Sequence, residues 1–263
     1  MPGDSDSFIT RDFSEVLRKI RKRTPARIFE GRAGAAYRTA SQLELREAHA
    51  AARDSVKAEL ELETAFGAEF VKQWDLFEVW TEARSKEEYL LRPDFGRSFP
   101  GESKQELSRR CSRDNDIQIA IGDGLSVPAV AAQVPSLLPL LYDGVRARGW
   151  TVGKTFVIRH CRVGTLNEIG EILAPKVAVL LIGERPGLAT AESLSAYMAY
   201  RPCAGHTDAN RNLISNIHGC GLGSRAAADR ILNLAAQMML QRMSGISVKE
   251  QLSNSLNLPA VSE

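Results

Sequence analysis

The hydrophobic and polar positions divide the chain into two parts that predict different structures. Residues 1–112 are charged and helical in period. A short helix is predicted near the start, because apolar residues recur at i, i+3, i+4 and i+7 on one face: Phe13, Val16, Leu17 and Ile20. A second helix is predicted from about residue 41 to 62, where apolar residues are so sparse that the helix needs another surface to lie on. Phe77–Trp80 is a candidate strand.

From residue 113 onward, short apolar runs alternate with helical segments. The runs predict three strands, at residues 117–121, 155–159 and 177–182. Helical segments follow the first two strands, and another helix is predicted over 226–243. We expect Pro135 and Pro139 to break the helical region after the first strand. The polar, aromatic-containing segment after the third strand is assigned no strand.

Strands that alternate with helices imply right-handed crossovers. The sequence therefore predicts an α/β fold with a mainly parallel, Rossmann-like sheet flanked by helices and preceded by a helical N-terminal region. The predicted organisation is a helical region over 1–112 that packs on a partner or on the core, an α/β domain over 113–250, and a C-terminal tail over 251–263.

The most informative stretch is residues 176–188. Six consecutive apolar residues, Val177 to Ile182, precede the sequence GERPG at 183–187. An apolar run without alternation is typical of a parallel strand that is buried on both faces. Three glycine-containing turns, at 122–126, 160–164 and 183–187, follow the predicted strands and should meet at one edge of the sheet. Because ligands of open α/β sheets bind beyond the carboxyl ends of the strands, this edge is the candidate ligand site.

The charged pair in the last of these turns has two interpretations. An ionised Glu184 only accepts hydrogen bonds, and the neighbouring Arg185 favours its charged form, so it suits the N–H groups of a ligand. The alternative is a surface ion pair between the two residues, which would contribute less than about 1 kcal/mol. In the first turn, Ser126 is placed to cap the helix that follows.

Composition excludes several classes of protein. Lys plus Arg number 34 and Asp plus Glu 32, so no net field favours nucleic acid or an anionic membrane. The chain is 44% hydrophobic and 25% charged, and no apolar run approaches the roughly 20 residues that span a bilayer. The opening MPGDSDSF lacks the basic-then-apolar order of a secretory signal. We therefore expect a cytoplasmic protein whose four cysteines are unpaired, with a disulfide framework as the minor alternative.

Motifs for nucleotide phosphates and metals are missing. No G-x-G-x-x-G opens a helix after the first strand and no Walker-type motif occurs, while the glycine-rich residues 219–223 follow no recognisable strand. The histidines and cysteines show no metal-type spacing, so no metal ligand is assigned. No set of Ser, His and Asp residues suggests a nucleophile, so no catalytic residue is assigned either.

Short motifs in a fixed order give the chain a family resemblance. They are ARIFEGRAG at 26–34, YLLRPDFG at 89–96, GDGLS at 122–126, EIGEIL at 168–173, VLLIGERPGL at 179–188, ESLS at 192–195, ISNIH at 214–218 and SGI at 244–246. In this combination they resemble the small (light) subunit of ethanolamine ammonia-lyase, an adenosylcobalamin-dependent enzyme. The resemblance covers nearly the whole chain, and GERPGL, ESLS and SNIH together are highly specific.

The resemblance implies a partner, a cofactor and a set of contacts. In this family a large subunit carries the substrate site, several large–small pairs form a higher hetero-oligomer, and adenosylcobalamin lies between the subunits with its dimethylbenzimidazole on cobalt. Ethanolamine becomes acetaldehyde and ammonia by radical chemistry of the cofactor. The α/β domain would form one wall of the cobalamin site, without catalytic residues of its own. The family's cobalamin contacts correspond here to Val163, Glu184 and Leu213; relatives carry Cys at the last position, so a thiol role there is excluded.

One near-motif concerns cobalt. Residues 216–221 approach the Asp-x-His-x-x-Gly motif by which some cobalamin enzymes ligate cobalt. Asn216 replaces the carboxylate of that motif, so we do not expect His218 to ligate the metal.

The alternatives to an enzyme subunit are a stand-alone Rossmann-like nucleotide-binding module and a purely structural assembly subunit. Some relatives carry a long N-terminal extension that targets a bacterial microcompartment; about a dozen residues precede the first helix here, which leaves that location open.

Overall fold

The computed structural model describes residues 15–24 and 26–250. Residues 15–21 are helical, so the described part of the predicted first helix is present, whereas its residue Phe13 and the predicted tail 251–263 lie outside the described residues. A small hairpin of β1 (Arg32–Ala33) and β2 (Ala36–Tyr37) follows.

A six-stranded sheet in the order β3-β5-β4-β6-β7-β8 forms the centre of a mixed α/β fold. Its bounds are β3 (Glu78–Trp80), β5 (Phe156–Arg159), β4 (Ile117–Gly122), β6 (Val177–Gly183), β7 (Leu194–Tyr200) and β8 (Asn212–Ile217). The first four strands in this order pair in parallel, and β7 and β8 continue the sheet in antiparallel pairs. Every residue of β4 and β6 is buried, as expected for strands covered on both faces.

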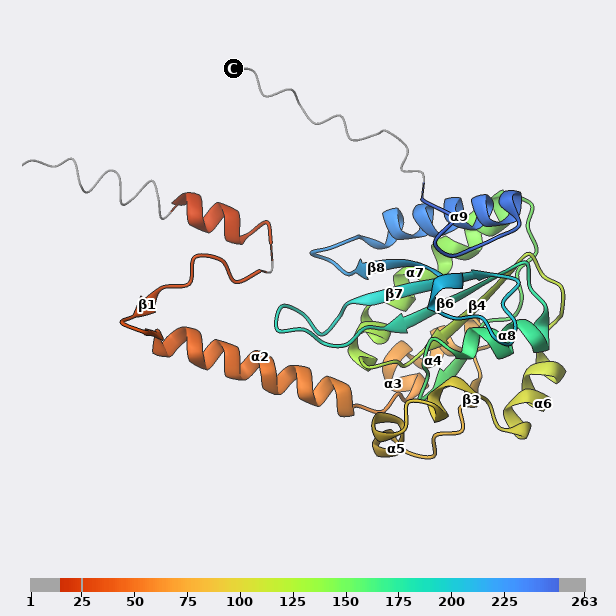
Figure 1. Ribbon diagram of the computed structural model, residues 1–263, viewed down its shortest axis with the longest axis horizontal. Helices are drawn as coiled ribbons and strands as arrows, with labels where there is room; N and C mark the ends of the chain where they lie inside the picture. The colour runs from red at the N-terminus through yellow and green to blue at the C-terminus, as the bar shows by residue number, and fades with distance from the viewer. Residues whose placement is uncertain (1–14, 25, 251–263) are drawn as a thin grey trace, which may run out of the picture.

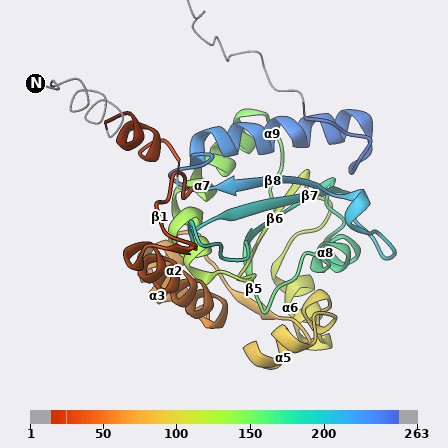
Figure 2. The same ribbon diagram turned by 60° about the vertical axis from the view of Figure 1, so that its left-hand side comes forward.

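Helices cover the two faces of the sheet unequally (Figures 1 and 2). On one face, α7 (Val127–Ala147) and α9 (Ser224–Gln241) pack against the sheet and each other, with α3 (Leu62–Phe66) and α4 (Ala68–Gln73) beside α7. The other face carries α6 (Gly101–Arg110) and α8 (Thr165–Leu173). The buried cluster on this second face includes residues of β3 to β6, and Tyr197 of β7 lies partly buried at its border. The face of β7 and β8 beside this cluster is therefore more open.

The N-terminal part of the chain extends from this body. Helix α2 (Thr39–Lys57) confirms the predicted second helix but ends five residues earlier than expected. Its only buried residue is Ser55, and Leu43 is 58% exposed. Figure 1 shows α2 running from the body toward the β1–β2 hairpin. Helix α5 (Lys86–Leu91) and two short 3-10 helices, η1 (Phe95–Arg97) and η2 (Asp208–Asn210), lie between the longer elements.

One prediction about the helices is wrong: α7 runs without a break through Pro135 and Pro139. Each proline removes one helical hydrogen bond and costs about 3 kcal/mol in a helix interior. Both residues are half-buried, while the helix buries Val130, Val134, Leu137, Leu138 and Leu141 in the core. Burial of each of these side chains contributes about 1.5–3 kcal/mol, which outweighs the cost of the prolines.

Strands β7 and β8 were not predicted. Their sequences, LSAYMAY and NLISNI, mix small, polar and apolar residues, so neither gives a clear strand pattern. Residues 215–217, which belong to the segment assigned no strand, form the end of β8. The candidate strand Phe77–Trp80 and the three other predicted strands are confirmed. The division at residue 112 stays a prediction, although β3 pairs with β5 across it.

Candidate functional site

The turns that follow β4, β5 and β6 meet at one edge of the sheet, as the sequence predicts. They enclose a cleft of about 450 Å³, which we call the strand-end cleft; its lining includes Gly124, Leu125, Cys161, Arg162, Val163, Gly183, Glu184, Arg185, Ser195, Tyr197, Leu213 and Ser215. The three residues carried over from the family, Val163, Glu184 and Leu213, all line it. Residues from three segments far apart in the sequence therefore share one surface.

Close backbone packing brings the first and third turns together. Gly124 has a φ of +58°, and a Cβ atom there would lie 2.3 Å from the Gly183 carbonyl oxygen, so only glycine fits. The Leu125 amide donates to that same carbonyl at 3.1 Å. Ser126 confirms the predicted cap, because its hydroxyl accepts from the Ala129 amide at 3.2 Å at the start of α7.

The Glu184 carboxylate is bound within its own chain and not to Arg185, so the ion-pair interpretation is wrong. It accepts hydrogen bonds from the Ser193 hydroxyl at 2.9 Å, the Ser195 hydroxyl at 2.6 Å and the Asn216 amide at 3.0 Å. Asn216 has a φ of +61°, and this bond holds its unusual backbone in place. Oε1 receives two of the bonds and Oε2 one, so Oε2 keeps an acceptor position for a ligand.

The open face of β7 and β8 forms the floor of one side of the cleft. Tyr197 and Leu213 are register partners, so their side chains project from the same side of the sheet. Ser195 and Ser215 lie two residues away on the same strands and therefore project to that side as well. Leu213 is 46% exposed. Burial raises the pKa of Tyr197, and the negative charges of Asp208 and Glu184 raise it further, so the phenol stays neutral. This side of the cleft is an apolar wall with hydroxyl groups.

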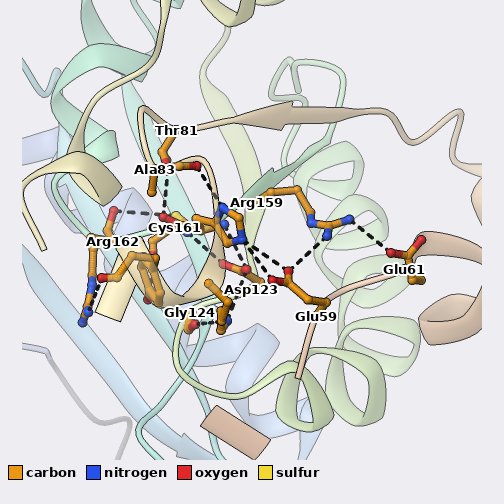
Figure 3. Close-up of polar contacts among 12 residues, drawn as sticks. Glu59, Glu61, Thr81, Ala83, Asp123, Gly124, Arg159, Cys161 and Arg162 are labelled. Atoms are coloured by element: carbon orange, nitrogen blue, oxygen red, sulfur yellow. Dashed lines mark hydrogen bonds and ion pairs between the residues drawn. The ribbon is translucent and has the colours of Figure 1, made fainter. Parts of the chain in front are cut away.

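A buried polar network lies beneath the turn after β5 (Figure 3). The fully buried carboxylate of Asp123 accepts from the His160 amide at 2.9 Å and the Cys161 amide at 2.8 Å. Its charge is balanced by Lys86, whose Nζ lies 3.5 Å from Oδ2 and donates to the Gly124 carbonyl at 3.2 Å. His160 has a φ of +57°, so the carboxylate holds a strained turn that leads directly to the cleft.

The outer part of the network joins this turn to the N-terminal part of the chain. The His160 ring lies 3.0 Å from the Ala83 carbonyl through Nδ1 and 3.2 Å from Glu59 through Nε2. Arg159 forms ion pairs with three carboxylates: Glu59, Glu61 and Glu78. Figure 3 shows Arg159 reaching toward Glu61, with Glu59 beside it. The contacts make the residues before β4 part of the support for the cleft.

Two ionisable groups of the network are held neutral. The Tyr89 hydroxyl donates to the Cys161 carbonyl at 2.9 Å, and burial raises its pKa far above its usual value. Burial likewise raises the pKa of the Cys161 thiol. Neither group is suited to proton transfer or nucleophilic attack near neutral pH. The network therefore has a structural character.

Other candidate residues also have partners within the chain. His218 is buried; its Nδ1 accepts from the Cys220 amide at 3.3 Å, and its Nε2 lies 2.7 Å from the Asn216 side-chain oxygen. All four cysteines are free, as predicted. Within residues 15–24 and 26–250, no group of His, Cys, Asp or Glu could hold a metal ion. In that same part of the chain, no helix has both the length and the apolar character to cross a membrane.

Sequence reasoning missed the roles of Asp123 and Arg162. Asp123 stands within the GDGLS motif and Arg162 within a predicted strand exit, but nothing in the sequence shows what either side chain contacts. Arg162 donates to the Tyr89 carbonyl at 3.3 Å, and its guanidinium lies 4.2 Å from the Tyr89 ring centroid. In chemical terms the cleft is a binding surface with an apolar wall, backbone groups and one accessible carboxylate position.

Comparisons with known proteins identify the family of the chain. Residues 14–249 match the family described as "Ethanolamine ammonia-lyase light chain (EutC)". The chain is similar to the ethanolamine ammonia-lyase small subunit of Clostridium perfringens, with 40% identity over 89% of this chain and 78% of the relative. It is also similar to the small subunit of Clostridioides difficile, with 38% identity over 90% of this chain and 78% of the relative. The small subunit of Clostridium acetobutylicum is 37% identical over 89% of this chain and 95% of the relative. The chain therefore belongs to the family of ethanolamine ammonia-lyase small subunits.

Proposed function

We propose that this chain is the small subunit of an adenosylcobalamin-dependent ethanolamine ammonia-lyase and that it forms one wall of the cobalamin site. The names of its relatives support an ammonia-lyase complex with a large subunit. The observation that carries the proposal for the cofactor is the convergence of Val163, Glu184 and Leu213 on the strand-end cleft. We infer that large and small subunits together form a hetero-oligomer.

The residues of the cleft fit the chemistry of cobalamin. The rim of a corrin bears propionamide and acetamide groups, which need hydrogen-bond acceptors and donors as well as an apolar surface. Glu184 Oε2 can accept from an amide N–H, and the exposed Leu213 offers apolar contact. Arg162 Nε is a buried donor without a partner in the described residues. Because a cleft of about 450 Å³ is smaller than cobalamin, the ligand needs a second wall, which agrees with a site between two subunits.

The part that this chain plays is to bind, orient and exclude water. The cofactor, when bound, supplies the radical chemistry that the side chains of this protein cannot perform. Val163 and Leu213 would remove water from the covered face, and Glu184 would orient an amide of the rim. Burial raises the pKa of Tyr89 and of Cys161, so these two groups would stay protonated beside the ligand. We therefore assign this chain no catalytic residue and place the substrate groups on the large subunit.

Co-expression with a candidate large subunit tests the proposal. The purified complex should release ammonia from ethanolamine only when adenosylcobalamin is added. Leu213→Glu should weaken cofactor binding by about tenfold or more, because burial of a leucine contributes about 1.5–3 kcal/mol and a carboxylate opposes burial. Leu240→Glu is the matched control, since Leu240 lies on α9 and is 85% exposed. Equal affinities of the two variants would contradict the proposed cleft.

A further inference from the structure

A second pocket of about 580 Å³ opens beside the strand-end cleft. It shares Arg162, Val163 and Tyr197 with the cleft, so a single ligand can extend from one to the other. Unlike the cleft, this pocket has several cationic side chains in its lining: Arg97, Arg162 and Arg211, with His206 beside them. We call it the arginine pocket.

Two of these arginines are held by reciprocal packing on glycines. A Cβ atom on Gly164 would lie 2.8 Å from the Cβ and Cγ atoms of Arg97, and one on Gly96 would lie 2.6 Å from the Cγ of Arg162. The Arg162 amide also donates to the Gly96 carbonyl at 2.7 Å. Residues 96–97 and 162–164 therefore cross with each arginine stem lying on the glycine of the other segment. Neither glycine can carry a side chain without displacing an arginine.

The charges of the pocket are unbalanced in favour of the cations. Its carboxylates are already engaged: Glu168 accepts from Lys104 Nζ at 2.9 Å and from the Phe99 amide at 2.6 Å, and Asp208 pairs with Arg211 at 2.5 Å. Among the described residues, neither Arg97 nor Arg162 forms an ion pair with a carboxylate. Because these two arginines have no carboxylate partner there and the two carboxylates of the pocket are already engaged, this arrangement suits an anionic ligand.

Unpaired donors give a second, independent indication. The Nε atoms of Arg162 and Arg211 are buried and have no hydrogen-bond partner in the described residues. The Arg211 side chain is only 6% exposed, although its other nitrogens reach Asp208 and Asn167. The nine-residue helix α8 begins at the same place, and its N-cap Gly164 provides no side-chain cap. The helix dipole adds a partial positive charge there.

We propose that the arginine pocket binds the phosphodiester in the nucleotide tail of the cobalamin whose corrin covers the strand-end cleft. This inference rests on the proposed function, because it places the tail of the same ligand. A phosphate oxygen is the anion that matches the fork geometry of guanidinium groups and the amides of a helix N-terminus. Arg162, which lines both cavities, would contact the ligand where the corrin and its tail join. Free phosphate has the same chemistry, and the experiment separates the two sources.

The test compares cobalamin with cobinamide, a corrin that lacks the phosphate, ribose and benzimidazole. The complex with the large subunit is titrated with each corrinoid by visible absorption, for the unchanged chain and for Arg97→Gln and Arg162→Gln. Arg162 also contacts Tyr89, so its loss can affect folding; Arg97, an exposed side chain, provides a second variant without that difficulty. Arg109→Gln is the matched control, because Arg109 pairs with Glu106 on α6, outside the pocket.

We expect both variants to weaken cobalamin binding by about tenfold and to leave cobinamide binding unchanged. Arg109→Gln should change neither affinity. Equal losses for cobalamin and cobinamide, or no loss for either, would overturn the inference while leaving the cobalamin site itself in place. If inorganic phosphate stabilised the complex through Arg97 but cobalamin affinity did not depend on that residue, the pocket would be a site for free phosphate and the inference would be wrong. Failure of the unchanged complex to bind either corrinoid would instead contradict the proposed function.

Discussion

The buried ion pair of Asp123 and Lys86 makes a sharp prediction about stability. Asp123→Asn keeps the shape of the side chain but removes its charge, and its amide group can accept only one of the two bonds from the His160 and Cys161 amides. It also leaves Lys86, whose side chain is 8% exposed, as a buried charge without its carboxylate. Breaking a buried pair in this way costs about 3–5 kcal/mol.

This loss is large compared with the whole stability of a domain, which is about 5–15 kcal/mol. For a chain of this size each kcal/mol lowers the unfolding midpoint by about 2–4 °C, so the expected decrease is about 6–20 °C. Thermal unfolding followed by circular dichroism measures it. Asp75→Asn is the matched control: Asp75 pairs with Lys154 and Arg110 but is 70% exposed, so its midpoint should match that of the unchanged protein.

A double variant separates the contribution of the Asp123–Lys86 ion pair to stability from that of the hydrogen bonds between Asp123 and the backbone amides. Lys86→Met removes the stranded charge, so Asp123→Asn should cost less in that background than in the unchanged chain. A decrease of less than about 2 °C for Asp123→Asn alone would refute the reasoning, because it would mean that the turn after β5 does not depend on this carboxylate.

Three further predictions concern stability and reactivity. Gly170→Ala should lower the free energy of unfolding by about 1–3 kcal/mol, because the new Cβ atom would lie 1.7 Å from the Pro202 carbonyl oxygen. Gly101→Ala is the control and should be tolerated, since no atom lies within 4 Å of its new Cβ. Denaturant unfolding of the two variants measures the difference. Iodoacetamide at pH 8 should label the exposed Cys203 and Cys220 but not the buried Cys161 or Cys111, since burial raises the pKa of Cys111 to about 11; mass spectrometry of the labelled peptides decides. Burial raises the pKa of Asp116, but hydrogen bonds from Lys176 and Thr151 outweigh this effect and hold the pKa below its usual value. The ionised carboxylate therefore stabilises the fold above about pH 4, and this contribution is lost as the pH falls through the lowered pKa. The stability difference between the unchanged chain and Asp116→Asn should therefore shrink at pH 3, and a constant difference would contradict the assignment.

The sequence predicted the parallel part of the sheet and the meeting of three turns at one of its edges. Residues 177–182 are apolar without interruption, and such a run has few stable places other than the centre of a parallel sheet. The ends of the parallel strands then place the three turns on one edge, which is how Val163 and Glu184 could be expected to meet. The family resemblance added Leu213, which lies on a strand that the pattern did not reveal.

The tertiary structure decided the features whose partners are distant in the sequence. The core contacts of α7 carry it through two prolines, and pairing with β6 turns the weak pattern of residues 194–200 into a strand. Glu184 binds Asn216 across 32 positions, Asp123 binds Cys161 across 38, and Arg162 packs on Gly96. Local patterns carry information over one or two helical turns or one strand. Contacts of this length exist only once the sheet has brought the segments together, which is why the sequence predicted which turns line the cleft but not how its charges are paired.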